Sequence, residues 1–167
     1  MRITRITFIA ALVGILLFGC NSQPKTTMER IDLLKKQVIT DADALQTIAN
    51  EKFPAIQKDF HECDSMLQYL SDEQVKANFD QLNLTQAYIL QFKEVGPIME
   101  KKMDYLVQQL DNLKSDAESH YLPDSLVLIY LDTESKVADT LHAQVDYFKD
   151  SFRNCQKSLD QMKKANQ

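Results

Sequence analysis

Cysteine has the widest chemical scope in this chain of 167 residues, which contains Cys20, Cys63 and Cys155. Paired thiols can form a disulfide, a redox centre or part of a metal site, whereas buried single thiols act as small apolar side chains. Cys63 and Cys155 have similar surroundings, because each has Phe three residues before it and Leu four residues after it. The sequence has no C-x-x-C motif, so a redox or metal site is the least favoured interpretation of this pair.

The histidines and carboxylates do not form a recognised catalytic pattern. The sequence lacks paired Glu-x-x-His motifs, His-Glu-x-x-His, Gly-x-Ser-x-Gly and Gly-x-x-x-x-Gly-Lys, which supply metal ligands, nucleophiles or phosphate-binding loops in enzymes. A single Asp139-x-x-His142 is the nearest approach to a ligand pair. We interpret the three histidines as solvated surface groups. We therefore expect a protein that is not an enzyme and that holds no metal or cofactor.

The elements that position these residues are predicted to be helices. Apolar side chains recur every three or four residues from Ile31 to Met162, which is the period of helices packed along a narrow stripe. The chain has only three Gly and four Pro, too few for most sheet topologies and loop-built active sites. We predict helices over residues 27–70, 72–118 and 124–165.

Local signals support these boundaries. Thr26 with Glu29, and Ser71 with Gln74, fit capping boxes at the starts of the first two helices. Pro123 suits the first turn of the third helix. Each helix would be about 65 Å long at 1.5 Å per residue. Their similar lengths predict an all-α fold. We expect an elongated, antiparallel three-helix bundle (up-down-up), similar to a coiled coil, over residues 27–167.

Two prolines strain this prediction. Pro54 and Pro97, the latter preceded by Gly96, lie inside the first and second helices. A proline in a helix interior removes one hydrogen bond and clashes with the preceding turn. We expect kinks at both places, and true breaks are the alternative.

The bundle predicts a partner for each core cysteine. The first and third helices run parallel, and an offset of 92 residues (155 − 63) also pairs other apolar residues of the two helices. This offset places Cys63 and Cys155 in one core layer, and an exported protein meets oxidants. We predict a Cys63–Cys155 disulfide covered by Phe79, with two inert buried thiols as the alternative.

The N-terminus indicates export. Residues 1–7 carry Arg2 and Arg5 and no acid, and an apolar run of about 13 residues follows, shorter than the roughly 20 of a membrane-spanning helix. This is the pattern of an export signal. Leu17-Phe18-Gly19-Cys20 then resembles the lipobox of bacterial lipoproteins.

That resemblance implies cleavage before Cys20, with residues 1–19 as the signal peptide, and thioether diacylglyceryl and N-terminal acyl groups (palmitate among them) on Cys20. Residues 20–26 would be the lipidated Cys and a polar tether. Several acyl chains anchor a protein durably. We expect a protein exported and lipid-anchored to the bacterial membrane. In a Gram-negative cell it would lie on the outer membrane facing the periplasm, since Asn21 is not the Asp that retains enterobacterial lipoproteins at the inner membrane.

Six consecutive apolar residues exceed what a narrow core stripe buries. They form a candidate contact patch, or alternatively a wider core layer: Leu126, Val127, Leu128, Ile129, Tyr130 and Leu131. From Cys20 onward, 17 basic residues face 24 acidic ones, a balance of −7, which disfavours nucleic acid as a partner.

Three functional hypotheses follow. The leading one is a non-enzymatic, lipid-anchored envelope module that binds another protein, as an envelope-complex subunit, inhibitor or immunity-type lipoprotein. The second is a self-associating structural spacer that uses Ile39, Leu90 and Tyr105. The third is a carrier of a small apolar ligand or metal between helices.

Overall fold

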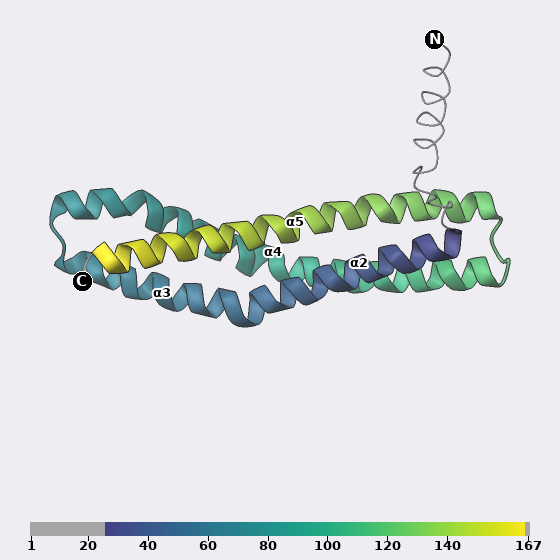
Figure 1. Ribbon diagram of the computed structural model, residues 1–167, viewed down its shortest axis with the longest axis horizontal. Coiled ribbons are helices and arrows are strands. Elements are labelled where there is room, and N and C mark those ends of the chain that lie inside the picture. Colours follow the sequence, from purple (N-terminus) through teal and green to yellow (C-terminus); the bar gives the residue numbers. More distant parts are fainter. Residues whose placement is uncertain (1–25, 166–167) are drawn as a thin grey trace, which may run out of the picture.

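The protein is a slender bundle of three antiparallel helical segments, as the computed structural model of residues 26–165 shows (Figure 1). The first segment comprises α2 (Thr27–Thr47), the π-helix η2 (Ile48–Lys52), α3 (Phe53–Met66) and the short 3₁₀-helix η3 (Leu67–Tyr69). The second is α4 (Asp72–Glu118) and the third is α5 (Asp124–Ala165). No strand occurs between residues 26 and 165. The predicted all-α, up-down-up architecture is confirmed.

Both predicted capping boxes are present. The Glu29 backbone N–H donates to the Thr26 hydroxyl, and the Thr26 backbone N–H donates to the Glu29 carboxylate at 2.8 Å. Ser71 and Gln74 repeat this exchange at the start of α4. Each box satisfies donors that the first helical turn leaves unpaired, which is why these two helix starts could be read from local sequence.

A single apolar core runs along the bundle. Its most completely buried side chains come from all three segments and expose 1% or less of their surface; they include Ile31, Met103, Leu106, Leu110, Val127, Val145 and Leu159. Buried residues recur every three or four positions along much of each helix, as Ile31, Leu34 and Val38 do in α2, so the narrow apolar stripe predicted from the sequence is the stripe that is buried.

Ion pairs on the surface show which levels of α2 and α4 face each other. Lys35 lies 2.5 Å from Asp111, and Lys114 lies 2.6 Å from Asp32. The two pairs agree on how the antiparallel helices are aligned, since a step of three residues back along α2, from Lys35 to Asp32, matches three residues forward along α4, from Asp111 to Lys114. Continued along the two helices, this register brings the π-helix η2 level with Gly96 of α4. A shallow cleft confirms the neighbourhood, because Ala49 and Pro97 line it together.

Both helix irregularities therefore lie at one level. In the first segment, the Phe53 backbone N–H donates to the Ile48 carbonyl oxygen, a π-type bond that widens the turn just before Pro54. The chain bends there and continues as α3 (Figure 1). Pro97 lies inside α4, which continues past it without a break. We expected kinks or breaks at these prolines: the first segment bends through a π-helix but stays helical, and α4 does not break at Pro97.

Candidate functional site

The predicted lipidation site lies outside the described residues. Cys20, the signal peptide 1–19 and the tether up to residue 25 all precede the first described residue, Thr26. The predictions for this segment therefore remain predictions.

The two core cysteines are free thiols in the structure, so the predicted Cys63–Cys155 disulfide is not present. Both are buried, with exposed fractions of 3% and 4%. The Cys63 thiol donates to the backbone carbonyl oxygen of Leu159 at 3.7 Å. Since Leu159 lies one helical turn beyond Cys155, Cys63 faces a level of α5 that the 92-residue offset does not match.

The surroundings of Cys155 also differ from those predicted. Its thiol lies beside the Thr85 hydroxyl of α4, and that hydroxyl donates to the Gln81 carbonyl oxygen. Phe79, expected to cover a disulfide, leaves 54% of its surface exposed. Burial raises the pKa of both the Cys63 and the Cys155 thiols. The thiolate is the reactive form, so this environment favours two inert thiols.

The apolar run at the start of α5 is divided between core and surface. Val127 and Leu131 are buried at 1% and 2% exposure, as a wider core layer would require. The other four side chains are exposed, by 38% to 58%, and we call them the terminal patch: Leu126, Leu128, Ile129 and Tyr130. The bundle end that carries this patch is also the end where α2 begins (Figure 1).

His142 is partly exposed, but it also contacts a buried carboxylate, which the sequence did not suggest. Its Nδ1 lies 2.9 Å from Asp41 Oδ1 and 3.0 Å from Oδ2, and the Asp41 side chain is only 6% exposed. The hydrogen bond with Asp41, and then the Asp41 charge, raise the pKa of His142 above its ordinary value. Asp146, one turn away, lies 3.4 Å from Nε2. The group joins α2 to α5.

A second polar cluster joins α3 to the end of α5. Lys163 Nζ donates to Asp59 Oδ1 at 2.5 Å and to Glu62 Oε2 at 2.6 Å. Gln156 Nε2 donates to the other oxygen of Asp59 at 2.8 Å. Desolvation raises the pKa of Asp59, but the Lys163 and Gln156 hydrogen bonds outweigh it and lower the pKa. The hydrogen bonds with Asp59 and Glu62 raise the pKa of Lys163. All charges here are mutually satisfied, so the cluster is structural.

A concavity lies between the bent segment and α5. We call it the basic groove; it has a volume of about 820 Å³. Residues 44–56 of α2, η2 and α3 form one wall and residues 149–157 of α5 form the other. Ile48, Ile56 and Phe152, buried to 3% exposure or less, provide its apolar floor.

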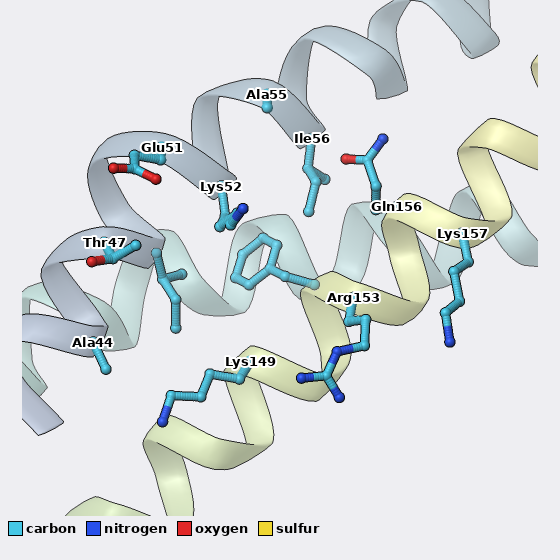
Figure 2. A pocket seen from close by; sticks show the side chains of 12 residues that line it. Ala44, Thr47, Glu51, Lys52, Ala55, Ile56, Lys149, Arg153, Gln156 and Lys157 are labelled. Atoms are coloured by element: carbon cyan, nitrogen blue, oxygen red, sulfur yellow. The ribbon is translucent and has the colours of Figure 1, made fainter.

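Charged side chains line the groove unequally. Four are basic, Lys52, Lys149, Arg153 and Lys157, whereas Glu51 is the one carboxylate. Figure 2 shows Lys52 on the bent wall and the other three cations in a row along α5. Residues spaced by four share a face of a helix, so α5 presents these three cations together.

Metal and membrane-spanning sites are not found in the described part of the chain. Among residues 26–165, no group of three or more His, Cys, Asp or Glu side chains is arranged to hold a metal ion. None of the helices described has a stretch of sufficient length and hydropathy to cross a membrane.

The chain matches no protein-family model, no curated protein and no solved structure. Any functional proposal therefore depends on its own residues.

Two features of the site were missed in the sequence. One is the Asp41–His142 pair. The sequence did contain a sign of it, because Asp41 is a charged residue at a position of the apolar stripe, three residues after Val38. The other is the basic groove. Its α5 wall was visible as three cations at four-residue spacing, but its floor depends on a bend whose size the sequence does not reveal.

Proposed function

We propose that the protein is a non-enzymatic lipoprotein of the bacterial cell envelope, anchored through Cys20, whose helical bundle binds another protein. The observation that carries the proposal is the lipobox-like Leu17–Cys20, which ends six residues before the capping box at Thr26. So short a connection holds the start of α2, and with it the terminal patch, close to the anchor.

The arrangement of the described surface supports a binding role. The terminal patch exposes four apolar side chains within five residues of α5, and exposed apolar surface that gathers in one region is typical of interaction sites. The polar clusters at His142 and Lys163 join one helix to another, as expected of groups that stabilise the bundle.

The anchor is tested by labelling living bacteria that express the full chain with an alkyne analogue of palmitate. We expect the label on the wild-type protein and on the Cys63→Ser control, and its loss together with membrane association in Cys20→Ser. Label that persists in Cys20→Ser would exclude the proposed anchor.

The partner is tested by placing a photoreactive amino acid at position 130, in the terminal patch. Tyr69 is the matched control, because it is 87% exposed and lies at the opposite end of the bundle. We expect a discrete crosslinked protein from position 130 and none from position 69. Crosslinks to lipid alone, or none at all, would contradict binding through this patch.

Self-association is a second candidate function, favoured by a separate observation. Ile39, Leu90 and Tyr105 are exposed by 41%, 53% and 63%, so the positions expected to join copies of the chain are free of the core. A crosslink between two copies, from position 105 rather than 130, would favour this function over binding of a different protein.

A further inference from the structure

The basic groove has the size and floor of a small-molecule site. Its volume of about 820 Å³ lies within the roughly 300–1,000 Å³ of ligand pockets, which occur between the helices of bundles and have mainly apolar linings. Ile48 and Ile56 on one wall and Phe152 on the other give an apolar floor. These three side chains are themselves almost completely buried, so an occupant with an apolar body would bury surface mainly against Ala44 and Ala55, which also line the groove and are more exposed.

The charge at its rim selects the sign of the occupant. Lys52, Lys149, Arg153 and Lys157 outnumber the single carboxylate of Glu51, although acidic residues exceed basic ones in the chain as a whole. A cluster of one sign beside low-dielectric walls concentrates counter-ions of the other sign. A negatively charged occupant therefore suits the groove better than a neutral or positively charged one.

Two of these cations have no ion partner. Within the described part of the chain, no carboxylate lies within 4.0 Å of the Lys52 or Lys157 ammonium group. Lys149 and Arg153 pair at 3.0 Å with Asp146 and Asp150 on the surface of α5. Exposed pairs of this kind contribute only about 0–1 kcal/mol, so an anion in the groove can compete with the two aspartates.

The shape favours a thin ligand over a helix of a partner protein. Residues 44–56 span about 18 Å at 1.5 Å per residue. A volume of about 820 Å³ over that length gives a mean cross-section of about 45 Å². A helix about 10 Å in diameter needs about 80 Å², whereas a single alkyl chain is far thinner.

We propose that the basic groove binds a single-chain anionic amphiphile, with its alkyl chain along the apolar lining between the two walls and its carboxylate or phosphate head among the cations of the rim. A long-chain fatty acid is the simplest member of this class. The site is separate from the terminal patch and does not depend on the anchor at Cys20. The proposed function and this inference can therefore fail independently.

The test uses the full chain in micelles of a neutral sugar-headed detergent. Three probes share one alkyl chain with a photoreactive diazirine and differ in the head group: carboxylate, phosphate or trimethylammonium. After illumination, the modified residues are located by mass spectrometry. We expect both anionic probes to modify the segments that contain the groove floor, and the cationic probe to do so about tenfold less, the effect of about 1.4 kcal/mol of charge preference.

The variants make the test specific. Lys52→Gln combined with Lys157→Gln should reduce modification by the anionic probes about tenfold, since two exposed charge contacts contribute about that much. Lys101→Gln combined with Lys102→Gln is the matched control on α4, where both residues are exposed, and should change nothing. Ala55→Trp, at an exposed position lining the groove, should block modification by filling the space, with circular dichroism to verify folding.

The outcomes separate clearly. The ratio between the carboxylate and phosphate probes identifies the head group. Equal modification by anionic and cationic probes, or modification that survives both the lysine pair and Ala55→Trp, would overturn the proposal. Loss of probe binding with intact palmitate labelling at Cys20 would leave the proposed function standing without this site.

Discussion

The two halves of the bundle are built differently, although the same three segments run through both. In the half that includes α2, the helix is regular and two ion pairs, Lys35–Asp111 and Asp32–Lys114, connect it to α4. In the other half the first segment contains a π-helix, a proline and a 3₁₀ turn. We call these the straight half and the bent half.

The difference in packing follows from the difference in backbone. The straight half buries aliphatic and methionine side chains such as Met103, Leu106 and Leu110. At the bend, four phenylalanines meet instead, with Phe92 ring centroids 5.1–5.2 Å from those of Phe53, Phe148 and Phe152. The basic groove and the smaller cleft both lie beside this cluster. Regular helices allow close packing of the core, whereas the bend of the first segment creates concave surface.

The largest effect that tests this comparison is the cost of removing a core side chain from each half. Leu110→Ala, at a position with no exposure, should lower the free energy of unfolding by about 3–4 kcal/mol. Ile56→Ala should cost only about 2 kcal/mol, because the adjoining groove lets water and neighbouring side chains fill the space. Urea denaturation followed by circular dichroism measures both. Leu90→Ala, at an exposed position, is the control, and equal losses at positions 110 and 56 would remove the distinction between the halves.

The second effect concerns the proline of α4. Pro97 is exposed and lies inside a continuous helix, where proline costs about 3 kcal/mol relative to alanine. Pro97→Ala should raise the free energy of unfolding by about 1–2 kcal/mol, part of the gain being lost because the neighbouring bend remains. Pro123→Ala, in the turn before α5, should give no such gain. If Pro97→Ala lowered the free energy of unfolding instead, the local distortion that Pro97 causes in α4 would be required for packing against the first segment.

A third prediction concerns the glycine beside it. A Cβ at Gly96 would lie 3.2 Å from Phe92 Cζ, and the packed phenylalanine cluster leaves that ring little room to move. Gly96→Ala should therefore lower the stability by about 1 kcal/mol, although alanine is the better helix former by about the same amount. In a Phe92→Leu background the same substitution should be stabilising. A double-mutant cycle measures the coupling, and additive effects would show that the ring is not the cause.

A smaller effect should appear in the pH dependence. The pKa of His142 is raised by its hydrogen bond with Asp41, so the folded chain holds the proton more tightly than the unfolded chain. This contribution is complete below about pH 6.5 and is lost as the pH rises through the folded-state pKa. Because His142 is 46% exposed, the loss should not exceed about 1 kcal/mol. His142→Gln should abolish it and His61→Gln should preserve it. An unchanged pH profile in His142→Gln would assign the effect to other groups.

The smallest predicted effect is the absence of a shift in electrophoresis. With Cys20→Ser, the reduced and unreduced chains should migrate together, because Cys63 and Cys155 are free thiols. Two thiols per chain should react with a thiol reagent rapidly after unfolding and slowly before it. Faster migration of the unreduced chain would instead indicate a Cys63–Cys155 disulfide. In that case α5 would have to be shifted by one helical turn relative to α3.

Helix boundaries were predictable because their causes are local. The exchange between Thr26 and Glu29, or between Ser71 and Gln74, requires only four consecutive residues, and the buried stripe follows from spacing within one helix. The relative level of two helices is a different kind of information. An apolar stripe that repeats every three or four residues matches its neighbour almost equally well after a shift of one turn.

This degeneracy explains why the fold could be predicted from the sequence although the structure does not contain the predicted disulfide. Matching Phe, Cys and Leu between the first and third helices gave an offset of 92 residues, whereas Cys63 meets Leu159. Side chains that have one suitable partner distinguish the levels, as Asp41 does with His142 and Asp59 with Lys163. Such pairs cannot be recognised from the sequence alone, because their partners are distant in the chain and meet only once the helices are aligned. The groove was unpredictable for the same reason, because it depends on the π-turn and on its alignment with Gly96.

That alignment has a mechanical consequence. A rod made of three helical segments is stiffest where all three helices are regular. Here two of the three are irregular at the same level, because the π-helix η2 lies beside Pro97 of α4. A force applied across the far tip, while the other tip is held, would concentrate strain in that section. Bending of the bundle would then change the width of the basic groove and of the smaller cleft. A molecule bound in either one would therefore be held more or less tightly when force acts tens of ångströms away.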